Sequence, residues 1–186
     1  HQDQRLVFVS RLVPRKGMWE LLEAFILLKQ RYPELSLYFV GDGSEMELLV
    51  SAVTEKNIRD VTFCGYVSAE EKAQILLDSD LFVFPTSYGE GCPASLLEAM
   101  AAGLPCVTTS IGGIPDVFTD KENGVMLDEV NPENIAAAIA GLLDDAASMN
   151  TISETNRKVS WDKYEAHSVA DRMANRYRSV LAAIAI

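Results

Sequence analysis

The chain has 186 residues, of which 48% are hydrophobic and 23% are charged, and its formal net charge is −11 at pH 7. This composition indicates a folded protein of one domain, or at most a tight pair, and not a disordered chain. The negative charge argues against a general nucleic-acid binder or a partner of anionic membranes. No apolar run reaches the length of a membrane span, and no signal peptide is visible.

Short apolar runs predict buried strands, and apolar residues at helical spacing predict helices between them. The predicted strands cover 6–9, 37–40, 61–64, 81–84, 105–108 and 125–127. The predicted helices cover about 21–28, 46–53, 69–77, a stretch beginning at 93, 135–143 and 169–181. After Asp145 the apolar pattern weakens until Trp161. This gap suggests that the terminal helix is an appendage that packs elsewhere.

Strands and helices alternate through the whole chain, which predicts a doubly wound, Rossmann-like parallel sheet of about six strands with helices on both faces. Sheets of this kind bind ligands outside the carboxyl ends of their strands. Each of the loops of interest follows such a strand end, so we expect them to converge on one crevice. These loops lie at Arg11, Gly41, Gly65, Thr86 and Ser110.

The segment from Gly89 to Glu98 carries two carboxylates, Glu90 and Glu98, that are eight positions apart. Its glycines and Pro93 predict a tight loop that leads into a helix, with Pro93 at the first helical position. The free N–H groups of a helix N-terminus form an anion site. An anion site between two carboxylates that can accept hydrogen bonds from hydroxyl groups predicts a nucleotide-sugar ligand. Its diphosphate would occupy the anion site, with the sugar on one side and the ribose on the other. The alternative is an exposed loop acid at Glu90 and a solvent-facing helix acid at Glu98.

Arg11 and Lys16 lie in the loop after the first predicted strand. Two cations at the mouth of the crevice could neutralise a diphosphate, Arg11 with a planar fork and Lys16 with a point charge. The alternative is a solvated basic loop, and Arg15 is interpreted as a surface residue.

Weaker signals accompany these residues. Gly41-Asp42-Gly43 is more often a turn or cap than a phosphate cradle, and Gly65-Tyr66 could lie beside a base or simply pack. Gly112-Gly113 is interpreted as turn chemistry with a possible close approach to a ligand. His167 is interpreted as a surface helix residue. The three cysteines, Cys64, Cys92 and Cys106, have neither disulfide nor metal spacing, which suits a reducing compartment.

Taken in order, these motifs resemble the group 1 (family 4) retaining glycosyltransferases of the two-domain GT-B architecture, over nearly the whole chain. The resemblance rests on 11–16, 41–43, 61–65, 90–98, 99–107 and 112–116. It implies that residues 1–186 are the C-terminal nucleotide-sugar-binding domain, one half of a GT-B enzyme. His1 is not an initiating Met, and a predicted strand follows almost at once. We therefore expect a piece of a larger protein whose N-terminal acceptor domain is missing.

The family resemblance implies roles for individual residues. Glu90 would contact the transferred sugar, Glu98 the ribose, and Arg11 and Lys16 the diphosphate, with the backbone of 91–96 lining the pocket. The implied catalytic residues are Arg11, Lys16 and Glu90. The implied donor-binding residues are Gly41, Gly65, Gly91, Cys92, Pro93, Ala94, Ser95, Leu96 and Glu98. Ser10, Cys92 and Asp116 depart from the common family pattern, and Cys92 leaves the sugar identity open.

The expected activity is metal-independent transfer of a glycosyl group from a nucleotide-sugar with retention, with no further cofactor and with an isolated fragment that is inactive. We expect a cytoplasmic protein that binds no nucleic acid and meets a membrane only through the missing half. One alternative is half of a nucleotide-sugar epimerase. Another is a regulatory module resembling a receiver domain, which the basic Arg11 disfavours. A dehydrogenase is disfavoured because no Gly-x-Gly-x-x-Gly follows the first strand.

Overall fold

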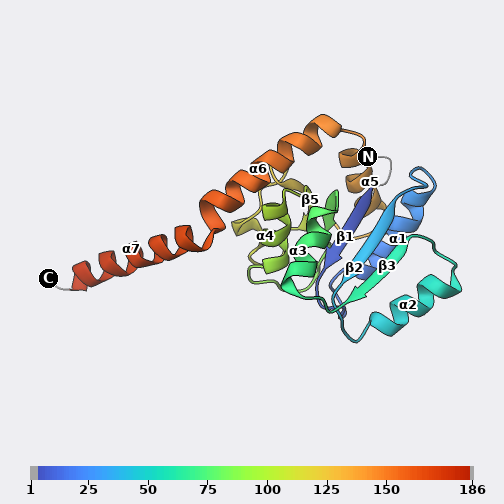
Figure 1. Ribbon diagram of the computed structural model, residues 1–186, viewed down its shortest axis with the longest axis horizontal. Helices are drawn as coiled ribbons and strands as arrows, with labels where there is room; N and C mark the ends of the chain where they lie inside the picture. The colour runs from blue at the N-terminus through green and yellow to red at the C-terminus, as the bar shows by residue number, and fades with distance from the viewer. Residues whose placement is uncertain (1–3, 185–186) are drawn as a thin grey trace.

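The computed structural model describes residues 4–184 and shows one sheet of six parallel strands in the order β3-β2-β1-β4-β5-β6 (Figure 1). The strands are β1 (Arg5–Val9), β2 (Ser36–Val40), β3 (Val61–Gly65), β4 (Leu81–Val83), β5 (Cys106–Thr109) and β6 (Gly124–Leu127). The predicted doubly wound sheet is therefore confirmed, including the sixth strand.

The central strands are apolar along almost their whole length because helices cover both faces of the sheet. In β1 the residues from Leu6 to Val9 are buried, and Phe8 lies opposite Phe39 of β2 in the parallel register. The two rings meet edge to face, with centroids 5.6 Å apart. The sheet interior is thus a continuous layer of large side chains.

The helices form two groups on opposite faces of the sheet (Figure 1). Helices α1 (Met18–Lys29) and α5 (Pro132–Leu143) pack against each other. Helix α3 (Ala69–Leu77) packs against α4 (Ala94–Ala102), and α4 packs against α6 (Ala146–Tyr164). Helix α2 (Met46–Glu55) connects β2 to β3, and a short 3₁₀ turn, η1 (Ile114–Asp116), precedes β6.

The order of the strands reverses between β1 and β4, which are neighbours in the sheet although their first paired residues, Leu6 and Leu81, lie 75 positions apart in the chain.

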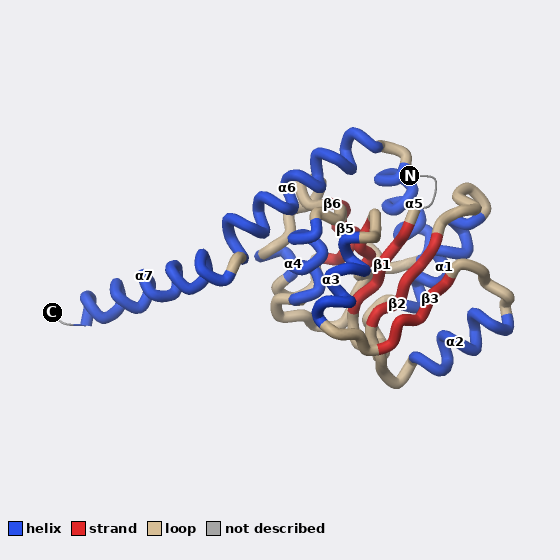
Figure 2. The backbone as a smooth tube through the Cα atoms, in the orientation of Figure 1, coloured by secondary structure: helices blue, strands red, loops and turns tan. Residues whose placement is uncertain are grey.

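 Leu6 of β1 pairs with Leu81 of β4, and the crossovers that leave the two strands run to opposite sides. Right-handed crossovers in opposite directions place their helices on opposite faces, so a crevice opens between the loops that follow β1 and β4. Figure 2 shows the loops that follow β1, β2 and β3 gathered at one end of the strands.

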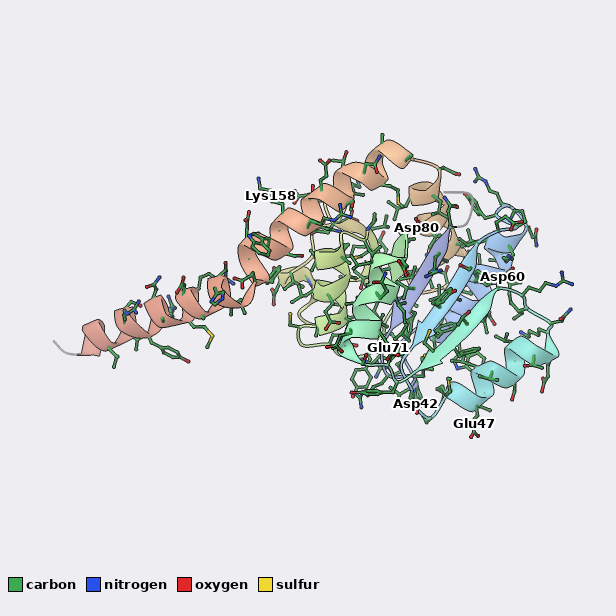
Figure 3. All side chains as sticks on the ribbon, viewed as in Figure 1. Asp42, Glu47, Asp60, Glu71, Asp80 and Lys158 are labelled. Carbon is green, nitrogen blue, oxygen red and sulfur yellow. The ribbon has the colours of Figure 1, made fainter. Side chains whose placement is uncertain are left out.

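The labelled side chains in Figure 3 show the polarity of the sheet. Asp42 and Glu71 lie at the carboxyl end of the strands, where the crevice opens. Asp60 and Asp80, which directly precede β3 and β4, lie at the opposite end. Substitutions near Asp60 therefore provide controls that are remote from the crevice.

Helix α6 corrects the interpretation of the segment after Asp145. It runs continuously from Ala146 to Tyr164 and packs on α4, although few of its residues are apolar. Its buried contacts include Asn156 and Ser160 as well as Ile152, so the contact face is largely polar and leaves no apolar stripe in the sequence.

The terminal helix α7 (Ala166–Ile184) follows the predicted helical stripe and extends away from the sheet (Figure 1). Met173, Tyr177, Val180 and Leu181 of this stripe are exposed. Among residues 4–184, no helix combines the length and the apolar character needed to cross a bilayer.

Asn156 fastens α6 to the domain. Its side-chain amide donates to the backbone carbonyls of Leu104 at 2.7 Å and Asn123 at 3.0 Å, and its Oδ1 accepts from Asn123 Nδ2 at 2.8 Å. Asn156 is fully buried, so loss of its amide would leave Asn123 Nδ2 without its acceptor and would remove one donor from each of the two carbonyls.

We expect Asn156→Ala to lower the free energy of unfolding by about 2–3 kcal/mol, because buried polar groups would lose their hydrogen bonds. Asn150→Ala, at an exposed position of the same helix, is the matched control and should change stability by less than about 0.5 kcal/mol. Urea denaturation of both variants measures the difference. Equal stability of the two variants would contradict the anchoring role.

Candidate functional site

A pocket of about 360 Å³ lies at the carboxyl ends of β1, β2 and β3, beside the first turn of α4. Its lining joins residues that are far apart in the sequence. Among them are Arg11, Gly41, Tyr66, Lys72, Ser95 and Glu98. The predicted convergence of the loops on one crevice is therefore observed for those that follow these three strands.

The pocket combines an unpaired cation with unpaired backbone donors. The Arg11 side chain is exposed and forms no ion pair or hydrogen bond with any residue in 4–184. At the start of α4, the N–H groups of Leu96 and Leu97 donate to the Pro93 carbonyl. Within the described residues, the N–H groups of Ala94 and Ser95 have no acceptor. A guanidinium and free helix N–H groups in one pocket can bind an anion.

Lys16 and Glu90 form a second cluster in the neighbouring loops. Lys16 Nζ lies 2.5 Å from Glu90 Oε1, and the two side chains are only 7% and 12% exposed. The buried Thr86 hydroxyl donates to the same oxygen at 3.1 Å. The Lys16 ammonium also lies 4.6 Å from the centroid of the Tyr88 ring. Two charges that would be costly to bury singly are thus paired and hydrogen-bonded.

Backbone packing sets the position of the Glu90 loop. Gly113 N donates to the Glu90 carbonyl at 3.0 Å, and Gly112 has a φ of 61°. A Cβ atom at Gly112 would lie 2.0 Å from the Glu90 carbonyl oxygen, so no larger residue fits without displacement. The predicted close approach at Gly112-Gly113 is therefore made to the backbone of Glu90 and Gly91.

The glycines after β2 and β3 also make close backbone contacts with neighbouring loops. Gly41 N donates to the Gly65 carbonyl at 2.8 Å. Gly41 has a φ of 130°, and a Cβ atom there would lie 1.9 Å from the Ser10 carbonyl oxygen. These contacts lock the loops after β1, β2 and β3 together under the pocket.

Glu98 reaches the pocket from the second turn of α4. Its Oε1 lies 2.7 Å from Lys72 Nζ of α3. Its Oε2 is buried and has no hydrogen-bond partner in the described part of the chain. One oxygen of this carboxylate is therefore held by a cation while the other has no donor.

The structure divides the predicted residues into groups. Five of them line the pocket, namely Arg11, Gly41, Ala94, Ser95 and Glu98. Lys16 and Glu90 form the adjacent ion pair, and Gly65 supports Gly41. Gly91 and Cys92 are exposed in the loop before α4, outside this lining.

One expectation for α4 needs correction. Pro93 is the N-cap with a ψ of 111°, and Ala94 is the first helical residue. The Leu96 side chain is fully buried and packs in the core, whereas the expectation for this residue concerned only its backbone. Its apolar character and its place on the inner face of a helix account for this position.

Two residues at the site were not assigned a role from the sequence. Thr86 was noted only as a loop position, and its signal is a hydroxyl that directly follows the Phe84-Pro85 strand end. Lys72 lies in a charged, exposed-looking stretch of α3, where no sequence signal separates it from a surface lysine.

Together the fold and the site define a doubly wound α/β domain with a crevice at the point where the strand order reverses. The chain belongs to the family "Glycosyl transferases group 1", whose sequence profile matches residues 1–159. It shares the Rossmann-like sheet of the GT-B enzymes. The regulatory-module and epimerase alternatives are accordingly not favoured.

Several known glycosyltransferases are similar to the chain. An uncharacterized glycosyltransferase of Methanocaldococcus jannaschii is 28% identical over 177 residues, which are 95% of this chain and 45% of that protein. A GDP-mannose-dependent phosphatidylinositol monomannoside mannosyltransferase of Mycolicibacterium smegmatis is 30% identical over 176 residues, which are 91% of this chain and 46% of that protein. The chain thus spans less than half the length of these relatives.

Solved structures show the same fold. Anabaena HepE in complex with UDP and glucose superposes with a TM-score of 0.84 at 22% identity, covering 96% of this chain and 49% of that one. S. aureus TarM, in a complex that contains UDP, gives a TM-score of 0.82 at 25% identity, covering 94% of this chain and 35% of that one.

We expect Lys16→Met to lower the free energy of unfolding by about 2–4 kcal/mol, because it leaves the buried Glu90 carboxylate without its cation. Arg11→Met removes an equal charge from an exposed position and should change stability by less than about 0.5 kcal/mol. Chemical denaturation of the two variants compares them directly. A Lys16→Met variant as stable as Arg11→Met would show that the ion pair contributes nothing to folding.

Proposed function

We propose that the chain binds a nucleotide-sugar and forms the donor side of a retaining glycosyltransferase. One observation carries the proposal: Arg11, the free N–H groups at the start of α4 and the Glu98 carboxylate line a single pocket. A nucleoside diphosphate offers the matching groups, since its phosphates are anionic and its ribose carries hydroxyl donors.

The proposed chemistry is electrostatic. As the glycosyl group leaves, negative charge grows on the diphosphate, and the sugar gains oxocarbenium character. Arg11 and the N-terminus of α4 would stabilise the leaving group, and Lys16 would add a positive charge nearby. Preorganised donors of this kind can each contribute about 3–4 kcal/mol to lowering the barrier. In this proposal the transfer needs no metal and no further cofactor.

Glu90 would contact the transferred sugar. Its Oε1 already pairs with the Lys16 ammonium and accepts a hydrogen bond from the Thr86 hydroxyl. Oε2 is therefore the oxygen left to accept a hydrogen bond from a sugar hydroxyl. The ion pair with Lys16 and the hydrogen bond from Thr86 orient this carboxylate without a ligand. Glu98 would bind the ribose, and the exposed Tyr66 ring at the pocket edge would lie near the base.

The relatives support a nucleotide-sugar donor. HepE is described in complex with UDP and glucose, and the mycobacterial enzyme is named as GDP-mannose-dependent. Because the chain spans less than half of these relatives, we propose that it is the C-terminal domain of a longer enzyme. The acceptor side would then come from the remainder of that enzyme.

Calorimetric titration with UDP, GDP and ADP tests the donor site. We expect at least one of them to bind, and Arg11→Met to weaken that binding about tenfold, because a charge-assisted hydrogen bond to phosphate is lost. Glu98→Gln should weaken binding about fivefold, because a neutral amide accepts hydroxyl bonds less strongly than a carboxylate.

The matched control is Arg59→Met, which removes an exposed arginine next to Asp60, at the opposite end of the sheet. It should leave nucleotide affinity within about twofold of wild type. Equal weakening by Arg59→Met and Arg11→Met would mean that only overall charge matters. No binding of any of the three nucleotides would reject the proposed function.

Thiol labelling gives an independent test at the start of α4. Cys92 is exposed, whereas burial raises the pKa of the half-buried Cys64 and of the fully buried Cys106. A raised thiol pKa leaves less thiolate, so iodoacetamide at pH 7.5 should modify Cys92 first. A bound nucleoside diphosphate should slow this reaction by about threefold or more, because it covers the loop before α4.

Mass spectrometry of the labelled peptides measures each cysteine separately. Cys64 is the internal control, because its modification should not respond to the nucleotide. Unchanged labelling of Cys92 at nucleotide concentrations that saturate the titration would place the ligand away from this loop.

A further inference from the structure

We propose that Lys72 is a positioning residue for the nucleoside. It holds one oxygen of Glu98 and so determines which ribose hydroxyl can donate a hydrogen bond to that carboxylate. This inference rests on the proposed function and adds to it a residue that selects between the two ribose hydroxyls.

The position of Lys72 is set by the start of α3. Ser68 caps this helix by accepting from Glu71 N at 3.2 Å, while Ser68 N donates to Glu71 Oε2 at 2.9 Å. The hydrogen bond from the Ser68 backbone N–H is the main cause that holds the pKa of the Glu71 carboxyl below its ordinary value. Lys72 N donates to the Ser68 carbonyl at 2.9 Å. The side chain of Lys72 therefore leaves a well-formed first helical turn.

From this turn Lys72 reaches Glu98 in the wall of the pocket. Its Nζ lies 2.7 Å from Glu98 Oε1, and its side chain is 29% exposed. Lys72, Glu98, Arg11 and Asp42 are the charged residues that line this pocket. Lys72 is thus the cation that contacts Glu98 there, while Arg11 has no carboxylate partner among the described residues.

The two oxygens of Glu98 are therefore not equivalent. Oε1 is held by the ammonium, and Oε2 is buried without a donor. A buried carboxylate oxygen without a hydrogen bond carries a desolvation cost, which a ligand hydroxyl can offset. A terminal carboxylate also rotates easily, so a small rotation presents Oε2 to the pocket. With Oε1 occupied, one ribose hydroxyl binds Glu98 strongly and its neighbour binds it weakly or not at all.

Removal of Lys72 would abolish this difference. Without the lysine, the Glu98 carboxylate can accept hydrogen bonds from both vicinal ribose hydroxyls, one on each oxygen, because a carboxylate has acceptor sites for both. Lys72→Arg keeps a cation that can reach the same oxygen, whereas Lys72→Met keeps length and apolar contacts without the charge.

The test uses UDP and GDP, each in its ribose, 2′-deoxy and 3′-deoxy form, titrated calorimetrically into the chain. In the wild type we expect one deoxy form to bind about tenfold more weakly than the ribose form and the other to bind within about twofold of it. In Lys72→Met we expect the two deoxy forms to differ from each other by less than about twofold. Lys72→Arg should restore the unequal pattern.

Lys56→Met is the matched control, because it removes the same charge from an exposed lysine at the end of α2. It should keep the unequal pattern. Thermal unfolding of every variant verifies that the fold is intact, and Lys72→Arg covers the case of an unstable Lys72→Met.

Equal affinity of both deoxy forms for the wild type, or an unequal pattern that persists in Lys72→Met, would overturn the role of Lys72 and leave the donor site standing. A uniform weakening of all ligands in Lys72→Met would also overturn it, because a general attraction for phosphate would explain that result. No binding of UDP or GDP by the wild type would reject this inference together with the site on which it rests.

Discussion

The pairing of β1 with β4 is the constraint on which the crevice depends. These strands are neighbours in the sheet, but their crossovers leave in opposite directions, so the loops that follow them diverge. Backbone hydrogen bonds then tie the loops to one another. Leu12 N donates to the Asp42 carbonyl at 2.9 Å, and Ser87 N donates to the Arg15 carbonyl at 2.8 Å. The crevice is therefore held by the main chain before any side chain contributes.

The same electrostatic arrangement occurs twice around this crevice. Lys16 holds Oε1 of Glu90, and Lys72 holds Oε1 of Glu98. Each pair holds one oxygen of a carboxylate and leaves the other oxygen for another donor. Arg11 differs, because it forms no ion pair within residues 4–184 and so retains its charge for an anion. In the proposed function the paired carboxylates meet hydroxyl groups and the unpaired arginine meets phosphate.

The correct predictions concern features that repeat locally. Each of the six strands appeared in the sequence as an apolar run, and α1, α2 and α5 appeared as apolar residues at helical spacing, while α4 was predicted from the loop that ends at Pro93. Helix α6 was missed because its contact with the domain depends on Asn156 and Ser160, which look like surface residues in a sequence.

The sequence by itself determined the alternation of strands and helices, the family, and the segments whose loops meet at the carboxyl end of the sheet. Those properties follow from hydrophobic periodicity and from motifs within a few residues of each other. Only the tertiary structure decided which cation holds which carboxylate. Lys16 and Glu90 are 74 positions apart, and Lys72 and Glu98 are 26 apart. Pairs at such separations form only when the order of the strands brings their loops together, and no local pattern records that order.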